Sequence, residues 1–161
     1  MADDLWNFSL RFYADADVQR ACLALQDAHG ADVNIALCLL WHATRGAIIG
    51  DDDVAALDAA VRPWREATVV PLRARRRALK ETVLFPDGEA QEAFRTRLKK
   101  VELEAERLEQ HILSAATVAA SARAGPETAG RANLAAYARF LRSDFTPGIV
   151  DTLAARLLAI A

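Results

Sequence analysis

The stretch from Asp32 to Ile49 constrains the fold most, because the seven residues from Ile35 to Trp41 are all apolar. A helix that is apolar on every side has no face for water, so it must be surrounded by other helices. Asp32 suits the start of this helix, since its carboxylate can accept hydrogen bonds from the free backbone N–H groups of the first turn. The sequence therefore predicts a buried central helix at about residues 32–49.

Apolar residues at helical spacing predict further helices around this central one. Two precede it, at residues 3–14 and 15–29, and Gly30 is expected to end the second in the left-handed conformation that glycine adopts readily. Two more are predicted near the end of the sequence, around residues 134–141 and from Thr146 onward. We expect no β-strand.

The middle of the chain predicts a bent helix followed by a long one. Residues 53–83 follow a helical pattern that Pro63 and Pro71 interrupt, and proline kinks or restarts a helix because it lacks a backbone donor. Residues 88–117 carry apolar side chains at alternating steps of four and three residues, as in a coiled coil. These side chains are Phe94, Leu98, Val101, Ala105, Leu108 and Ile112. The stripe can face the core of its own chain or a second subunit, so a homodimer is an alternative to a monomer.

Together these patterns predict an all-α fold, a single compact bundle of about six or seven helices formed by residues 1–161 as one domain. A chain of this length can bury a core without a disulfide or a metal. Cys22 and Cys38 lie among alanine and leucine in helical patterns, so we expect both to be reduced and buried.

Charge and hydropathy disfavour several classes of partner. The 20 Lys and Arg residues nearly balance the 22 Asp and Glu residues, so the whole molecule has no field that would attract nucleic acid or anionic lipid. The first residues lack the pattern of a signal peptide, and the longest apolar run, seven residues, is far shorter than the roughly 20 residues of a membrane span. We therefore expect a cytoplasmic protein of a bacterium-like cell that does not bind membranes.

The first candidate functional segment is the basic stretch PLRARRRALK, residues 71–80. Arg73, either Arg76 or Arg77, and Lys80 share one face of the predicted helix, where their donors can bind a protein partner or an anion such as phosphate. The alternative interpretation is a charged face that is simply solvated, which is the usual meaning of a charge run.

An internal ion pair is a further interpretation of this segment. The apolar stripe on the same helix lacks an apolar residue between Leu72 and Leu79, and Arg75 or Arg76 occupies that position. An arginine that is buried there without a partner would be strongly destabilising. We therefore expect one of these two arginines to pair with an acidic residue of the long helix, namely Glu102, Glu104 or Glu106.

The second candidate site consists of polar residues among the apolar opening helices. Gln26, Asn34 and His42 can line a pocket, although hydrogen bonding at helix ends is the more common explanation for such residues. Cys38 and His42 are spaced for a metal, but only two ligands are visible and structural zinc takes four, so we predict no metal. The sequence has no phosphate-binding loop, dinucleotide fingerprint or nucleophile motif, so we predict no cofactor, assign no catalytic residue and favour a protein that is not an enzyme.

Two stretches carry a specific sequence pattern, LWNFSLRFYADADVQRACLALQDAHGADVNIALCLLW from Leu5 to Trp41 and PLRARRRALK from residue 71. In both, and more loosely through Trp64 and LKKVELEAERLEQ to about Leu113, the chain resembles a family of small bacterial proteins, mainly proteobacterial, described as a domain of unknown function. The resemblance implies a cytoplasmic, all-helical protein, and it transfers no catalytic residues.

Three functions remain as hypotheses. The first is a non-enzymatic adaptor or regulator that binds an unidentified protein through the basic helix and the charged long helix. The second is a small-ligand protein or enzyme with an apolar pocket and an Arg and Lys anion site. The third is weak nucleic-acid binding, which we rank last because the molecule as a whole is slightly acidic.

Overall fold

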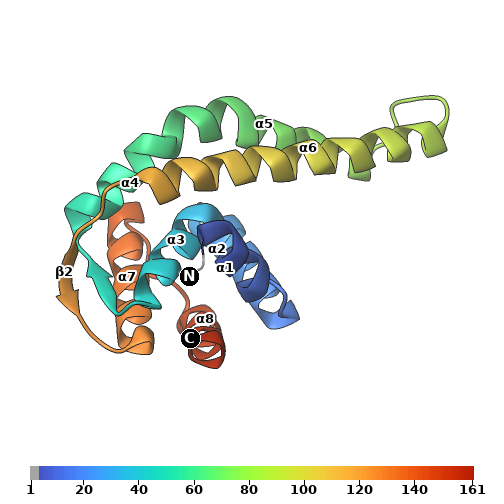
Figure 1. The fold of residues 1–161 in the computed structure, drawn as a ribbon. Coiled ribbons are helices and arrows are strands. Elements are labelled where there is room, and N and C mark those ends of the chain that lie inside the picture. The colour runs from blue at the N-terminus through green and yellow to red at the C-terminus, as the bar shows by residue number, and fades with distance from the viewer. Residues whose placement is uncertain (1–3) are drawn as a thin grey trace.

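The computed structural model describes residues 4–161 as a helical protein with one small two-stranded sheet (Figure 1). Three consecutive elements, α4, η1 and α5, form a single bent helix, so the described residues hold seven helices in all. The predicted all-α fold with one long helix is therefore confirmed. In chain order, the elements are α1 (Leu5–Phe12), α2 (Ala16–His29), α3 (Val33–Ala43), β1 (Ala47–Ile49), α4 (Asp51–Trp64), η1 (Arg65–Val69), α5 (Val70–Glu81), α6 (Gly88–Ala115), β2 (Ala120–Arg123), α7 (Pro126–Leu141) and α8 (Pro147–Ile160).

The central helix α3 is buried on every side, as its composition predicts. Residues 35–40 are each at most 4% exposed, and helices α1, α6 and α7 pack around them. Asp32 caps the helix, because its Oδ1 accepts a hydrogen bond of 2.9 Å from the backbone N–H of Asn34. Gly30 has a φ of +66° and ends α2 in the left-handed conformation. The local signals where α2 ends and α3 begins therefore predicted these two helix ends correctly.

The chain leaves α3 earlier than predicted, at Ala43, and the expectation of no strand is wrong. Gly46 turns the chain with a φ of +73°, and a Cβ there would lie 2.6 Å from the carbonyl oxygen of Ala124. β1 then pairs with β2 in an antiparallel register that places Ile48 opposite Ala122. Three residues are too few to show an alternating pattern, and their partner strand is far away in sequence.

The bent helix confirms the division predicted near its two prolines. Pro63 lies inside α4 and Pro71 lies in the first turn of α5. Between them η1 is a π-helical segment, in which the backbone N–H of Val70 donates to the carbonyl of Arg65. Such a widened turn commonly re-aims a helix. Trp64 anchors the bend, because its indole Nε1 donates to the carbonyl of Ala105 in α6 at 2.9 Å.

Helices α5 and α6 run side by side as an arm that extends beyond the rest of the molecule (Figure 1). We call residues 70–100 the arm, and α1, α2, α3, α7 and α8 the body. Gln91 closes the end of the arm, since its side chain accepts from the N–H groups of Leu84 and Phe85 and donates to the carbonyls of Leu79 and Thr82. Among residues 4–161, no helix is both long enough and apolar enough to span a membrane.

The apolar stripe of α6 does not face a single surface. Ala105 is buried and Leu98 and Ile112 are partly buried against the same chain, whereas the other three members of the stripe are half exposed. These three are Phe94, Val101 and Leu108, with 52%, 48% and 48% of their surface exposed. The stripe therefore contributes to the core of its own chain and also leaves an apolar row on the outside.

Helix α7 completes the core through a buried amide. Asn133 is fully buried, and its Nδ2 donates to the carbonyls of Leu39 and Ala47 at 2.9 and 3.0 Å. Its Oδ1 accepts from the N–H of Ile49 at 2.8 Å. One side chain thus satisfies three buried backbone groups around the turn that follows α3.

Candidate functional site

The basic residues of α5 are partly neutralised by the long helix. Arg76 forms an ion pair with the buried carboxylate of Glu102. Arg73 lies 3.4 Å from Glu102 and donates to Glu106 at 3.1 Å. These contacts hold Arg73 and Arg76 in fixed positions. Of Arg75 and Arg76, the two candidates for the position that interrupts the apolar stripe, Arg76 is the one that pairs with a buried glutamate.

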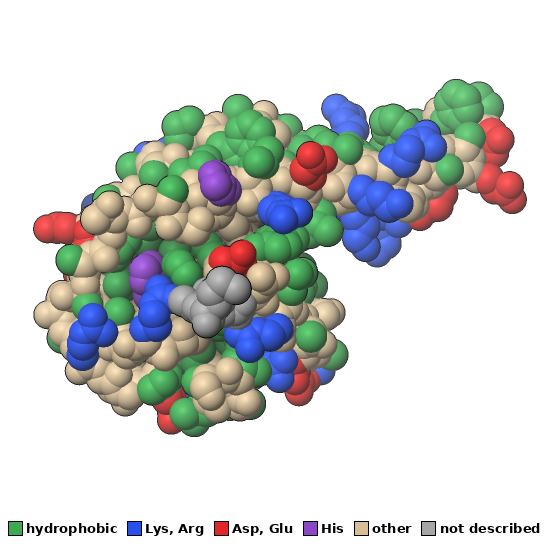
Figure 2. Space-filling view, in the orientation of Figure 1, with side chains coloured by type: hydrophobic (Ala, Val, Ile, Leu, Met, Phe, Trp, Pro, Cys, Tyr) green, Lys and Arg blue, Asp and Glu red, His purple; other side chains and the backbone are tan. Residues whose placement is uncertain are grey.

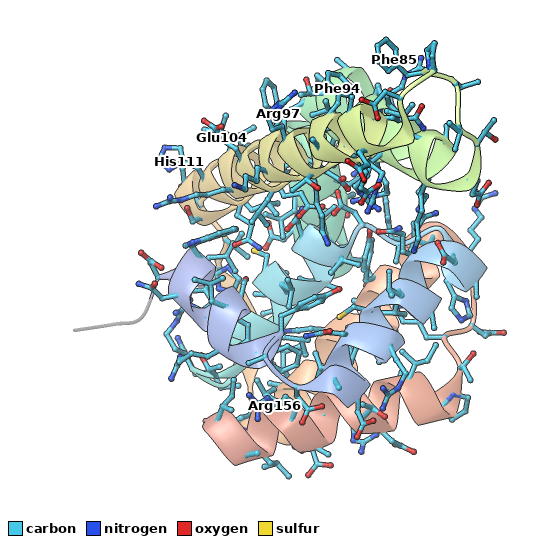
Figure 3. All side chains as sticks on the ribbon, turned by 90° about the vertical axis from the view of Figure 1, so that its right-hand side faces the viewer. Phe85, Phe94, Arg97, Glu104, His111 and Arg156 are labelled. Atoms are coloured by element: carbon cyan, nitrogen blue, oxygen red, sulfur yellow. The ribbon has the colours of Figure 1, made fainter. Side chains whose placement is uncertain are left out.

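The remaining charged residues of the two candidate sets point elsewhere. Arg75 is exposed, and Glu104 is exposed on the outer face of α6, so neither takes part in the buried pair (Figure 3). Arg77 is exposed and reaches across to Asp27 of α2, with 3.3 Å between their side chains. Lys80 is exposed in the last turn of α5. The sequence-predicted basic face is therefore divided between an internal network and solvent.

A cleft of about 530 Å³ separates the arm from helices α1 and α2. Five basic side chains and two glutamates line it, and Figure 2 shows Lys and Arg on the arm beside this hollow. Leu23 and Leu103 supply apolar surface to the same cleft and are 47% and 51% exposed. The cleft therefore combines an excess of positive charge with accessible leucines. Its charged lining is Arg73, Arg76, Arg77, Lys99, Lys100, Glu102 and Glu106.

An inner pocket of about 160 Å³ adjoins the cleft and shares Gln26 and Arg73 with it. Asn34 lines this pocket and accepts a hydrogen bond from the Gln110 amide at 3.0 Å. Ser9 donates in turn to Gln110 at 3.2 Å. The structure thus places two of the predicted pocket residues, Gln26 and Asn34, beside one pocket.

His42 does not line this pocket. It lies at the end of α3, where its Nδ1 is 3.3 Å from the guanidinium of Arg45. Burial and the positive charge of Arg45 lower the pKa of His42 to about 4, so its imidazole is neutral at pH 7. Because His42 is separated from Gln26 and Asn34, these three residues do not form one site.

A charged cluster lies beneath the cleft, where α3, α4, η1, α6 and α7 meet. Nη1 of Arg65 bridges two buried carboxylates, at 3.2 Å from Asp32 and 2.8 Å from Asp58. Tyr137 accepts a hydrogen bond of 2.8 Å from the backbone N–H of Asp32. These four residues line a hollow of about 200 Å³ that also contains Arg73. The cluster is therefore continuous with the wall of the cleft.

Glu109 is the most buried acid of this region, with none of its surface exposed. One of its carboxylate oxygens accepts from the Asn34 amide at 3.2 Å. Burial, together with the neighbouring Asp32 carboxylate, raises the pKa of Glu109 well above its usual range. A neutral carboxyl at Glu109 avoids the repulsion that two ionised carboxylates would exert on each other.

Glu109→Gln should make stability less dependent on pH. The folded protein keeps the Glu109 proton that the unfolded chain releases near pH 4.5, so stability must fall as the pH rises above that value. Urea denaturation between pH 5 and 8 measures the free energy of unfolding, which should fall more steeply with pH for the wild type than for the variant, by up to about 1.4 kcal/mol per pH unit. Glu81→Gln, at an exposed site at the end of α5, is the control. Equal pH slopes for wild type and Glu109→Gln would contradict the assignment.

Sequence reasoning missed Asp58, Arg65, Glu109 and Tyr137. One signal was available, because Asp58 interrupts the otherwise apolar face of α4 and Arg65 follows it two helical turns later. Glu109 had no comparable signal, since it belongs to a run of glutamates that resembles a solvated face.

The structure offers no obvious metal site in residues 4–161, where no three His, Cys, Asp or Glu side chains are grouped to hold an ion. Cys22 and Cys38 are buried and free, and burial raises the pKa of each thiol to about 12. Neither thiol therefore has the thiolate character that metal binding or nucleophilic chemistry requires.

The fold and the site define a mainly helical protein with a charged cleft above a buried polar cluster. Residues 4–113 match the family model described as "Protein of unknown function (DUF2390)", and the chain belongs to this family. The resemblance seen in the sequence is thereby confirmed. No curated protein and no solved structure matches the chain. The matched region ends within α6, so α7 and α8 lie outside it.

Proposed function

We propose that this protein is a non-enzymatic interaction protein of the bacterial cytoplasm that binds an acidic, amphipathic helix of a partner protein. The observation that supports the proposal is the lining of the cleft, where five basic side chains and half-exposed leucines face the same space. A helix with apolar residues on one side and carboxylates beside them matches both properties.

The basic side chains of the cleft differ in how freely they can pair with a partner carboxylate. Arg73 and Arg76 are held by buried or partly buried glutamates, so they position the arm and contribute little free charge. Lys99 and Lys100 are exposed on α6, and among residues 4–161 Arg77 has only the exposed Asp27 as its ion-pair partner. A partner carboxylate can therefore displace Asp27 and pair with the lysines at little desolvation penalty.

The proposal predicts a charge-dependent contact at Leu103. A photo-activated benzoylphenylalanine at Leu103, expressed in the protein's own host, should cross-link to a partner segment that carries acidic side chains at helical spacing. Lys99→Glu/Lys100→Glu should reduce the yield of this adduct at least about tenfold, because the steering charges are reversed. Mass spectrometry of the digested adduct measures both the yield and the partner sequence.

Two controls make this test specific. Arg131→Glu/Arg139→Glu reverses the same amount of charge on α7, at partly exposed ion pairs, and should leave the adduct unchanged. The photo-probe at Leu158, a half-exposed residue of α8, should give no adduct of the same mass. An adduct at Leu103 that survives the lysine reversal, or no adduct at all, would refute the proposal.

A small anionic ligand is the second candidate, and the inner pocket favours it. Arg73, Gln26, Asn34 and Gln110 line a space of about 160 Å³, which suits a compact polar group. Native mass spectrometry of protein purified gently from its host distinguishes the two. A mass excess that is lost on denaturation would indicate a bound small molecule, whereas the bare mass would favour the protein partner.

A further inference from the structure

The outer face of α6 carries a second heptad pattern that the body leaves uncovered. Positions 94, 97, 101, 104, 108 and 111 alternate steps of three and four residues, and all six side chains are exposed. Figure 3 shows Phe94, Arg97, Glu104 and His111 on one side of the helix, pointing away from the body. We call these six residues the outer seam. Its spacing is that of a helix that packs against another helix.

Half of the outer seam is apolar. Phe94, Val101 and Leu108 recur every seven residues and are each about half exposed. Beside Phe94 lies a hollow of about 490 Å³ that is lined by Leu79, Leu84 and Phe85. Large exposed apolar side chains in a row beside an apolar hollow are typical of an interaction surface.

The charges of the outer seam are complementary to those of a second copy of α6 in the antiparallel orientation. Arg97 lies four residues before Val101, and Glu104 lies three residues after it. Two copies of α6 that cross antiparallel at Val101 would therefore bring each Arg97 close to the other copy's Glu104. A parallel pair would instead place Arg97 beside Arg97 and Glu104 beside Glu104, which is repulsive.

We propose that the outer seam is the interface of an antiparallel homodimer with its two-fold axis near Val101. In this arrangement Phe94 packs near the other copy's Leu108 on both sides of the axis, and two Arg97 and Glu104 pairs flank the centre. The contact is isologous, so it closes at two subunits. Lys99 and Leu103 project from the opposite side of α6, so the dimer leaves the cleft open and is independent of the proposed partner.

A cysteine at the axis tests the register of this dimer. Val101→Cys places two identical thiols next to each other, and mild oxidation should link most of the protein into a covalent dimer. The native Cys22 and Cys38 are buried, so they should not compete. Leu158→Cys, on α8, is the matched control and should remain largely unlinked. If Val101→Cys links no faster than the control, the proposed register is wrong.

A charge exchange tests the orientation. Sedimentation velocity should find the wild type dimeric at micromolar concentration, and Arg97→Glu or Glu104→Arg alone should weaken the dimer about tenfold or more. The double variant Arg97→Glu/Glu104→Arg should restore it to near the wild-type constant, because the pair is re-formed with its charges swapped. Circular dichroism checks that each variant is folded. A wild type that stays monomeric, or single variants that dimerise like the wild type, would overturn the proposal.

Discussion

Replacing Arg65 by methionine should lower the free energy of unfolding by about 3 to 5 kcal/mol, because two buried carboxylates lose their shared cation. Asp32 and Asp58 are both nearly inaccessible to water, and Arg65 is the residue that bridges them. Chemical denaturation at pH 7 measures the loss. The same measurement near pH 4 should show a smaller loss, since protonation removes the uncompensated negative charge.

Arg62 provides the matched comparison for this prediction. It also pairs with Asp58, at 2.6 Å, but its own side chain is 54% exposed. Arg62→Met should therefore change the free energy of unfolding by about 1 kcal/mol or less. If the two methionine variants are equally stable, the bridge at Arg65 is not a stabilising element of the fold.

Asn133→Ala should destabilise the protein by about 3 to 5 kcal/mol, because each buried backbone group left without a partner is worth about 1 to 3 kcal/mol. The Asn133 amide makes three hydrogen bonds of 2.8 to 3.0 Å to the backbone around the end of α3 and β1. Thermal or urea unfolding, followed by circular dichroism, measures this loss.

Ser121 serves as the control for the amide. Its hydroxyl donates to the carbonyl of Ile48 in the same strand pair, at 3.1 Å and at an exposed position, where water can replace it. Ser121→Ala should therefore have an effect below about 1 kcal/mol. A loss at Asn133 that is no larger than the loss at Ser121 would mean that water reaches the end of α3.

The parts of the fold that the sequence predicts are those with local signals. Asp32 and Gly30 mark helix ends through groups that lie within a few residues, and the apolar run of α3 needs no knowledge of its neighbours. The β1 and β2 pair could not be predicted, because Ile48 and Ala122 meet only through the folded chain. The bend at η1 was predictable since both prolines are visible in the sequence.

The candidate site was predictable only where a charge interrupted an apolar pattern. Arg76 occupied such an interruption, and the structure pairs it with Glu102. On α6 the same reasoning failed, because a polar row that includes Glu102 and Glu109 faces the body and half of the apolar stripe faces outward. Burial of a carboxylate depends on partners from other helices, such as Asn34, which a single sequence does not bring together.

Hydrogen bonds between residues far apart in sequence also affect the folding kinetics. Helical proteins of this size usually fold quickly because most of their contacts are local. Here Asn133 binds Leu39 across 94 residues, and Arg156 donates to the carbonyl of Phe12 across 144 residues. The entropy of closing such long loops must be lost before the core is complete. Since the ribosome makes α3 long before α7, a nascent chain exposes its most apolar helix for many seconds, which is when a chaperone would recognise it.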